Sequence, residues 1–354
     1  MALNRDENEA AWLTGTGEPL KVGAILNWTP GPGEIRVRNE VISLNPIEAK
    51  LQKFNMFQLP YPAVLGFTFA GTVTDVGPDV TSVARGDRVA VARWGATARE
   101  DRFGAFQKYP LALERNVLRL GDASSLEDGA GVIANLATAV SALTIHMGLD
   151  HRPATPSGGG GRIDKNGERI LIYGGSTAIG GLAVKYASDA GYEVVTTSSA
   201  ANEALVRRRN PTHVVDHGQP PEDVVQALRS YGPYDAILEA TGSEAGTALM
   251  GRLLGASGGG LFFSTSPSPN DDALPAGVVK RWSSYSEDLV SDPARGALRD
   301  WFVGEYLPRG VQTGAVWPNP ASRVPGGLSG LQDALDRLRE GKVSGVKLVV
   351  YPQE

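Results

Sequence analysis

One stretch of the chain constrains the fold more than any other, and it covers residues 169–199, RILIYGGSTAIGGLAVKYASDAGYEVVTTSS. An apolar run is followed by a glycine-containing turn, a segment with helical periodicity and a second apolar run. In the periodic segment, the apolar residues recur at Ile179, Leu182, Ala183, Tyr186 and Ala187. Further apolar runs alternate with helical stretches up to residue 266. This order predicts an α/β fold with a parallel sheet that is buried on both faces.

The turn in this stretch, YGGSTAIGG at residues 173–181, is a candidate phosphate-binding turn. A glycine-rich turn that opens a helix directs backbone N–H groups and the positive end of the helix at a pyrophosphate. The spacing G-x-G-x-x-G is not present, so an ordinary strand-to-helix turn is the alternative. The candidate cofactor-binding residues are Gly174, Gly175, Ser176, Thr177, Ala178, Ile179 and Gly180.

The end of the second apolar run favours NADPH over NADH. An NAD site usually places Asp or Glu about 20 residues after the turn, where the carboxylate binds the ribose 2′-hydroxyl. Here the run ends TTSSAAN, without an acidic residue from Val194 to Asn202. Ser198, Ser199 and Asn202 are small donors for a 2′-phosphate. Arg207–Arg209 is either a nearby source of positive charge or a solvated helix face.

Composition excludes several classes of function. The 354-residue chain has no cysteine, which excludes disulfides, thiolate zinc sites and cysteine nucleophiles. Its four histidines, at positions 146, 151, 213 and 217, show no metal-ligand spacing, so we expect no metal. The net charge of −5 provides no basic surface for nucleic acid or an anionic membrane. The charged start MALNRDENEAAWL has no apolar signal region, which favours a cytoplasmic protein.

Residues 129–149, GAGVIANLATAVSALTIHMGL, carry no charged residue and are long enough to span a bilayer. Asn135, Thr138, Ser141 (or Ala142) and Ile145–His146 nevertheless recur about every three positions and form a stripe along one helix face. A buried helix with a polar face is therefore the preferred interpretation, and a membrane helix is the alternative.

The remaining segments differ in character. Short runs at 33–45, 70–77, 86–93 and 116–120, separated by glycine–proline turns, predict a β-rich domain in the first 125 residues. Residues 153–169, PATPSGGGGRIDKNGER, predict a loop. After Tyr285, we expect helices at 295–307 and 328–342 and a last strand at 345–352.

Several phrases spread over nearly the whole chain resemble the medium-chain dehydrogenase/reductase superfamily. They are ENEAAWL, GEIRVRNEVISLNPIEAK, LGFTFAGTVTDVGPDVTSVARGDRVA, GAFQKY, ILIYGGSTAIG and LREGKVSGVKLVVYP. More narrowly, the chain resembles the zinc-free fungal branch of trans-acting enoyl reductases of polyketide pathways and related quinone-oxidoreductase-like proteins. The resemblance implies a GroES-like β-rich catalytic domain split around a Rossmann doubly wound parallel sheet. We expect the catalytic domain over 1–127, the Rossmann domain over 128–285 and a C-terminal return to the catalytic domain over 286–354.

The resemblance also implies the cofactor and the residues around it. Zinc-dependent relatives need a cysteine ligand and a Gly-His-Glu segment, where this chain has Phe67 and Thr68 in place of His and Glu. A zinc-independent enzyme that uses NADPH is therefore implied. Carried over by position, Ile47 and Lys50 border the cofactor, and its phosphates are held by Ser176–Ile179 and Ser199–Asn202. Phe262 and Phe263 flank the nicotinamide. Val343 and Ser344 close over it.

The activity implied is hydride delivery to an activated C=C, in an enoyl thioester or an enone, in secondary metabolism. Lys50 is the candidate catalytic residue, because the negative charge that develops on the conjugated oxygen needs a stabilising group. The expected partner is a small-molecule substrate, either free or as a polyketide chain carried by a synthase, and the protein itself is expected to be a monomer or a homodimer. The candidate substrate-binding residues are Thr138, Ser141, Ala142, Ile145, Trp282 and Tyr285.

Three alternatives to this activity need to be weighed. The first is an NADPH quinone reductase, and the second is a non-redox tailoring or scaffold protein that binds NADP(H). The third is a serine hydrolase, since GASGG at 255–259 matches G-x-S-x-G. A nucleophile elbow must follow a strand and open a helix. Ser257 instead follows a helical stretch and precedes an apolar run, which argues against the hydrolase.

Overall fold

The computed structural model describes residues 8–150, 152–153, 167–267 and 273–354, so most of the predicted loop at 153–169 lies outside the described residues. The chain divides into two compact units. We call Met1–Ala134 with Gly310–Glu354 the β unit and Asn135–Arg309 the Rossmann unit. The expected boundaries at 127 and 285 differ from this division, because the first helices after residue 285 pack within the Rossmann unit.

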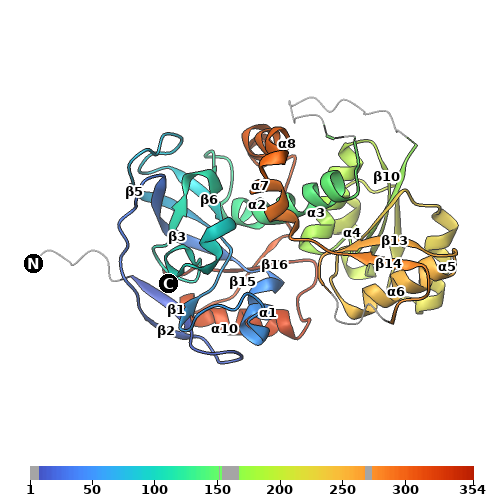
Figure 1. Cartoon of the computed structure of the whole chain (residues 1–354), viewed down its shortest axis with the longest axis horizontal. Coiled ribbons are helices and arrows are strands. Elements are labelled where there is room, and N and C mark those ends of the chain that lie inside the picture. Colours follow the sequence, from blue (N-terminus) through green and yellow to red (C-terminus); the bar gives the residue numbers. More distant parts are fainter. Residues whose placement is uncertain (1–7, 151, 154–166, 268–272) are drawn as a thin grey trace, which may run out of the picture. The chain divides into compact units, whose positions relative to one another are not determined.

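Six parallel strands form the sheet of the Rossmann unit, in the order β11-β10-β9-β12-β13-β14. Their bounds are β9 (Arg169–Tyr173), β10 (Glu193–Ser198), β11 (His213–Asp216), β12 (Ala236–Glu239), β13 (Gly260–Ser264) and β14 (Val278–Arg281). The helices that connect them are α3 (Ala178–Asp189), α4 (Glu203–Arg207), α5 (Pro221–Tyr231) and α6 (Glu244–Gly255) (Figure 1). This is the order of a doubly wound dinucleotide-binding sheet, whose switch point lies between β9 and β12. The predicted Rossmann sheet is confirmed, with β14 as a strand that the sequence did not indicate.

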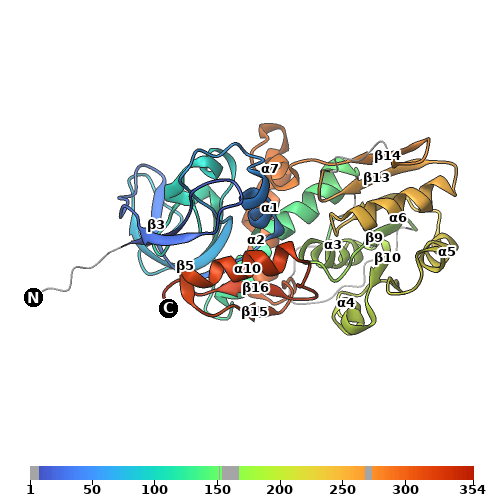
Figure 2. The same cartoon turned by 90° about the horizontal axis from the view of Figure 1, so that it is seen from below.

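The β unit contains two sheets. The larger has the order β15-β16-β3-β5-β6-β8, with β7 beside β3, and the smaller has the order β2-β1-β4. The bounds are β1 (Glu9–Leu13), β2 (Lys21–Ala24), β3 (Glu34–Ser43), β4 (Ala63–Val64), β5 (Thr68–Val76), β6 (Arg88–Ala92), β7 (Leu111–Leu113), β8 (Val117–Arg119), β15 (Ala321–Arg323) and β16 (Lys347–Val350). Helix α1 (Pro46–Phe54) contacts α10 (Leu331–Arg339), and Figure 2 shows α10 beside β15 and β16. The expected β-rich domain is confirmed, and the C-terminal segment completes its larger sheet.

The helix expected at 295–307 is a series of shorter pieces. After α7 (Tyr285–Val290), helix α8 (Gly296–Trp301) continues through a π-helical turn (Phe302–Tyr306) into α9 (Leu307–Gln312). Phe302 and Tyr306 are buried, whereas α8 itself has no buried residue. The apolar spacing therefore predicted the extent of this helical segment but not its breaks.

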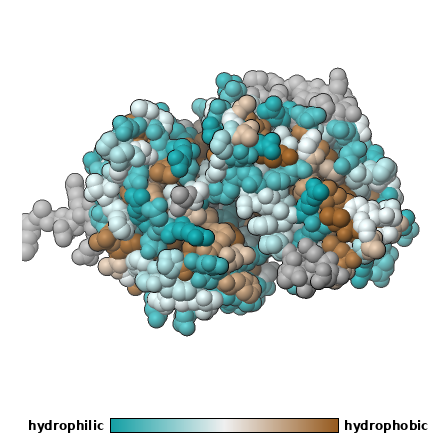
Figure 3. Space-filling view, viewed as in Figure 1, coloured by the Kyte–Doolittle hydropathy of each residue, from teal (hydrophilic) through white to brown (hydrophobic). Residues whose placement is uncertain are grey.

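The long apolar helix belongs to the protein core. Helix α2 (Leu126–Val140) continues into a π-helical turn (Ser141–His146), and together they are long and apolar enough to cross a membrane. However, 72% of the most apolar window is buried inside the structure. On the face shown in Figure 3, hydrophilic and neutral residues surround separate hydrophobic areas. Burial of this kind is typical of a core helix in a soluble protein.

Candidate active site

The candidate phosphate-binding turn lies at the carboxyl end of β9, beside the switch point of the sheet. Gly174 has φ +92°, and a Cβ there would lie 2.6 Å from the Thr241 methyl carbon. At Gly180, a Cβ would lie 2.2 Å from the carbonyl oxygen of Gly174. Glycine is therefore required both where the chain turns and where α3 packs against the turn. The Thr177 hydroxyl caps α3 by accepting a hydrogen bond from the N–H of Gly180 at 2.9 Å.

Two backbone donors at the start of α3 are available to a ligand. In the described part of the chain, the N–H groups of Ala178 and Ile179 donate to no protein atom, whereas Thr177 accepts from Gly180 and Gly181. First-turn N–H groups and the positive end of a helix dipole favour anions. The residues present thus fit the pyrophosphate of a dinucleotide, which the first turn of α3 would hold.

The carboxyl end of β10 holds the residues expected at a 2′-phosphate. Ser198 is buried, and its hydroxyl donates to the Ser199 carbonyl at 3.0 Å. Ser199 and Asn202 are half-buried; Ser199 precedes a short 3-10 turn, and Asn202 is the last residue of that turn. Asp216 lies beside Ser198 in the strand register, but its carboxylate accepts the N–H of Gly218 at 2.8 Å. The structure thus gathers three small polar residues at this strand end.

The three arginines after β10 do not form one cationic face. Arg207 and Arg208 are exposed, and Arg207 pairs with Glu203 at 2.6 Å. Arg209 is fully buried, and a Cβ at Gly181 of α3 would lie 2.6 Å from its guanidinium carbon. Burial lowers the pKa of Arg209 to about 10. A source of positive charge for the 2′-phosphate and a solvated helix face were the two interpretations of these arginines. Either one applies only to Arg207 and Arg208, because Arg209 is part of the core.

The ends of β12 and β13 meet around Glu239, which is fully buried. Its carboxylate accepts hydrogen bonds from the loop that follows β12 and from Ser264 at the end of β13. Ser264 also accepts at its carbonyl from the Tyr285 hydroxyl, at 2.9 Å. Phe262 lies in the apolar core of the unit and Phe263 is almost as buried, so neither aromatic side chain is exposed at this edge of the sheet.

A histidine that the sequence did not single out as a site residue lies next to Tyr285. The His146 and Tyr285 rings meet edge to face, with centroids 5.0 Å apart. His146 Nε2 is 2.9 Å from Asp288 Oδ2, and the Ser283 hydroxyl donates to the same oxygen at 2.5 Å. Neither sequence spacing nor periodicity relates residue 146 to residue 288, so only the fold reveals this pair.

The other candidate substrate residues divide by burial. Ser141 and Ala142 are completely buried, because the π-helical turn directs both into the core. Thr138 and Ile145 are half-buried, Tyr285 is buried and Trp282 is 47% exposed. The exposed surface of the set therefore comes mainly from Thr138, Ile145 and Trp282, and the substrate-binding role of all six residues stays a prediction.

In the β unit, Ile47 and Lys50 lie on α1, and both are half-buried. The helix begins at Asn45, whose N–H donates to the Glu48 carboxylate at 2.7 Å. Pro46 occupies the first helical position, where its missing N–H costs nothing. Val343 is half-buried and Ser344 exposed in the segment before β16. The structure thus holds the candidate catalytic lysine on a helix with a well-formed start.

A buried charged cluster supports the first turn of α1. Lys347 of β16 donates from Nζ to Asn45 Oδ1 at 2.6 Å, and Asn45 Nδ2 donates to Glu48 Oε1 at 3.3 Å. Thr68 joins the cluster by accepting from Asn45 Nδ2 at 3.1 Å. Burial raises the pKa of Glu48, and the positive charge of Lys347 counteracts part of that rise. Burial also lowers the pKa of Lys347 to about 8.

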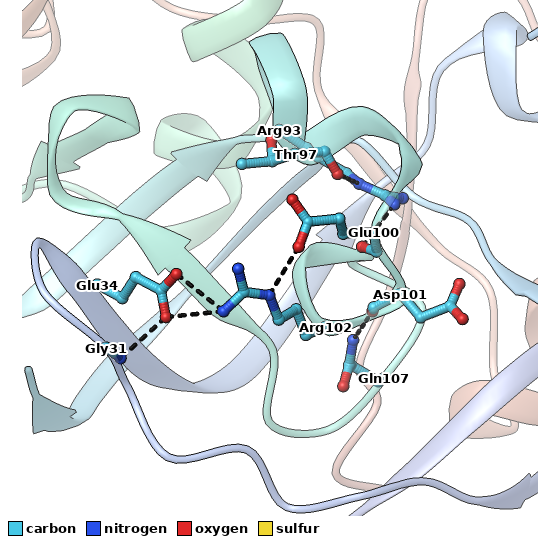
Figure 4. Close-up of polar contacts among 8 residues, drawn as sticks. All are labelled: Gly31, Glu34, Arg93, Thr97, Glu100, Asp101, Arg102 and Gln107. Atoms are coloured by element: carbon cyan, nitrogen blue, oxygen red, sulfur yellow. Dashed lines mark hydrogen bonds and ion pairs between the residues drawn. The ribbon is translucent and has the colours of Figure 1, made fainter.

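Two arginines hold the segment between β6 and β7 (Figure 4). Arg93 is buried, and its guanidinium donates at 2.8, 2.9 and 2.8 Å to the carbonyls of Thr97, Val64 and Glu100. Arg102 is nearer the surface and pairs with Glu34 at 2.9 Å and with Glu100 at 2.8 Å. This segment consists of two short 3-10 turns, so side chains supply much of the hydrogen bonding that a strand would obtain from its neighbours.

The rival chemistries find little support in the described residues. Among them, no group of three His, Asp or Glu side chains is arranged to hold a metal ion. That the enzyme requires no metal stays a prediction. Ser257 lies in the turn after α6, and its hydroxyl donates to the Leu253 carbonyl at 3.1 Å. Since this serine does not stand between a strand and a helix, it is not at a nucleophile elbow.

Comparison with known proteins identifies the family. The alcohol dehydrogenase GroES-like domain matches residues 31–145. The chain is 31% identical to the trans-enoyl reductase himH of Aspergillus japonicus, over 97% of both chains. The chain belongs to the medium-chain dehydrogenase/reductase superfamily. It is an oxidoreductase, and the Rossmann unit of such a protein implies a nicotinamide cofactor.

Two solved structures share the fold. A quinone oxidoreductase of Pseudomonas syringae is 19% identical, with a TM-score of 0.74 and coverage of 98% of this chain and 100% of that one. A mycobacterial protein solved in complex with NADPH is 20% identical, with the same TM-score and coverage. At this level of identity, the likeness concerns the fold alone.

Proposed function

We propose that the protein is an NADPH-dependent reductase that delivers hydride to the β-carbon of an enoyl thioester or an enone, in cytoplasmic secondary metabolism. The observation that carries this proposal is the similarity, over 97% of both chains, to a trans-enoyl reductase. The substrate arrives either free or attached to a synthase as a polyketide chain. The half-buried Thr138 and Ile145 and the exposed Trp282 suit an elongated apolar substrate better than a small polar metabolite.

The choice of NADPH is supported by the carboxyl end of β10. Ser198, Ser199 and Asn202 lie there, and the strand itself ends without a carboxylate. A carboxylate would accept a hydrogen bond from a ribose 2′-hydroxyl but would repel a 2′-phosphate. The exposed Arg207 and Arg208 follow shortly after this strand end and add positive charge.

NADPH, when bound, supplies the hydride. The first turn of α3 would hold the pyrophosphate, and the small residues after β10 would hold the 2′-phosphate. Lys50 stabilises the negative charge that develops on the conjugated oxygen, by a hydrogen bond or through water. A proton then adds to the α-carbon, which completes the reduction of the double bond. Alcohol oxidation is disfavoured because Phe67 and Thr68 replace the zinc-site His and Glu of zinc-dependent relatives.

The decisive experiment is an NADPH oxidation assay with three substrate classes, an enoyl thioester, an enone and a quinone. Turnover of the first two with loss of the C=C bond is expected. Turnover of the quinone alone would identify a quinone reductase, and tight NADPH binding without any turnover would identify a non-redox protein. Lys50→Met should lower kcat, whereas Lys53→Met, at the exposed end of the same helix, should not.

Cofactor choice is tested by Ser198→Asp. A carboxylate at this strand end should weaken NADPH binding by about tenfold or more, because it lies close to the 2′-phosphate. NADH binding should weaken less or improve. Equal affinities of the unmodified protein for NADPH and NADH, measured by titration, would contradict the proposed preference.

A further inference from the structure

The Glu239 carboxylate gathers donors from two loops. Oε1 accepts the N–H of Thr241 at 2.8 Å, the N–H of Gly242 at 3.1 Å and the Thr241 hydroxyl. Oε2 accepts the Ser264 hydroxyl at 2.8 Å and shares the N–H of Gly242 at 3.1 Å. No salt bridge reaches Glu239 in the described part of the chain. The charge of this fully buried group is thus balanced by hydrogen-bond donors alone.

These donors belong to loops at the ligand-binding edge of the sheet. Glu239 ends β12, which borders the switch point, and Ser264 ends the neighbouring β13. Gly242 has φ +60°, and a Cβ there would lie 2.9 Å from Ser266 Cβ, so the two loops pack tightly. The Thr241 methyl in turn closes on Gly174 of the phosphate-binding turn. One carboxylate therefore links the loops that follow β12 and β13, and the first of these packs against the turn after β9.

We propose that Glu239 is a positioning residue for the nicotinamide half of the cofactor, an inference that rests on the proposed NADPH-dependent function. An ionised carboxylate only accepts hydrogen bonds, which suits a site surrounded by four donors. Burying its charge without a cation is costly unless those bonds are all made. A glutamine has the same size but would direct its NH₂ group at donors. The loops on the β12–β13 side would then separate, while the strand end of β10 would keep its geometry.

The test compares two probes on the Glu239→Gln variant. NADPH carries both halves of the dinucleotide, whereas adenosine 2′,5′-bisphosphate carries only the adenosine half. Calorimetric titration should show NADPH affinity reduced by about tenfold, since one or two hydrogen bonds to a charged group are lost. The affinity for adenosine 2′,5′-bisphosphate should change by less than about twofold. Glu239→Asp, which keeps the charge, should restore part of the NADPH affinity.

Glu193→Gln is the matched control. Glu193 begins β10 at the opposite, amino edge of the same sheet, where it pairs with Arg169 at 2.7 Å. Both probes should bind this variant as they bind the unmodified protein.

Equal weakening of the binding of both probes by Glu239→Gln, or no weakening of either, would overturn the positioning role. If Glu239→Gln does not fold, Ser264→Ala removes one donor and should show the same selectivity to a smaller degree. Failure of the unmodified protein to bind NADPH would instead overturn the proposed function and this inference with it.

Discussion

Among the described residues, two carboxylates are fully buried, one in each compact unit, and their surroundings differ. Glu48 in the β unit shares its site with the ammonium of Lys347, and the Asn45 amide bridges the two groups. Glu239 in the Rossmann unit accepts only from hydroxyl and backbone N–H donors of nearby loops. The first arrangement ties together α1 and β16, which are about 300 residues apart in the sequence. The arrangement around Glu239 fixes the conformation of loops that are close to this carboxylate, either along the chain or on the neighbouring strand of the sheet.

The difference indicates that the two sites stabilise different parts of the structure. Two opposite charges buried near each other add little net stability, but removing one leaves the other uncompensated. Such a pair enforces one arrangement of the elements it joins, here the start of the helix that carries Lys50. Backbone donors around a carboxylate instead fix loop conformation, which matters at a ligand-binding edge.

The largest expected effect comes from Lys347→Met. The apolar side chain leaves Glu48 buried without its cation, and the free energy of unfolding should fall by about 3–5 kcal/mol. Adding Glu48→Gln to this variant should recover a substantial part of the loss. Urea unfolding of the unmodified protein, the two single variants and the double variant will measure this double-mutant cycle. Lys342→Met, at a fully exposed lysine paired with Glu340, should leave stability unchanged. Additive losses in the cycle would show that the two charges are not coupled.

The second effect concerns Arg93. Replacing it with Met removes the three hydrogen bonds that the guanidinium donates to the carbonyls of Thr97, Val64 and Glu100, so unfolding free energy should fall by about 3 kcal/mol. Arg102→Met, in the same segment, removes a partly exposed ion pair and should cost about 1 kcal/mol or less. Figure 4 shows both arginines, and thermal unfolding of the two variants compares them directly. Equal losses would mean that burial does not distinguish their contributions.

The sequence predicted the Rossmann unit far better than these clusters. Continuous apolar runs and helical spacing are local signals, so β9 to β13 and the turn at Gly174 could be located within a few residues. The sequence left open whether Ser141 and Ala142 line a pocket or are buried in the core, because a π-helical turn changes which residues face the core. Asn45 joins Glu48 to Lys347, and His146 contacts Asp288; these contacts link distant segments, and no local pattern encodes them. Arg209 was misjudged because its charge argued for solvent, whereas Gly181 makes room for it in the core.

The third effect is a dependence on pH in the Lys347→Met variant. Burial raises the pKa of Glu48 in the folded state, and without Lys347 the pKa rises further. Between the unfolded value of 4.5 and the raised folded value, the folded state binds more protons. Unfolding free energy should therefore fall as pH rises through this window, by up to about 1.4 kcal/mol per pH unit. The Lys347→Met/Glu48→Gln double variant lacks both groups and should not show this slope in urea unfolding between pH 5 and 8.

The smallest effect tests the other carboxylate. Ser264→Ala removes one of the four donors around Glu239, and the loss of a hydrogen bond to a charged group should lower unfolding free energy by about 1–2 kcal/mol. Glu239 keeps its bonds to Thr241 and Gly242, so the loss should stay well below that of Lys347→Met. Ser257→Ala, at an exposed turn of the same unit, is the control and should be neutral. A loss as large as that of Lys347→Met would mean that the donors act as one cooperative unit, and no loss at all would mean that Ser264 does not help to balance the buried charge.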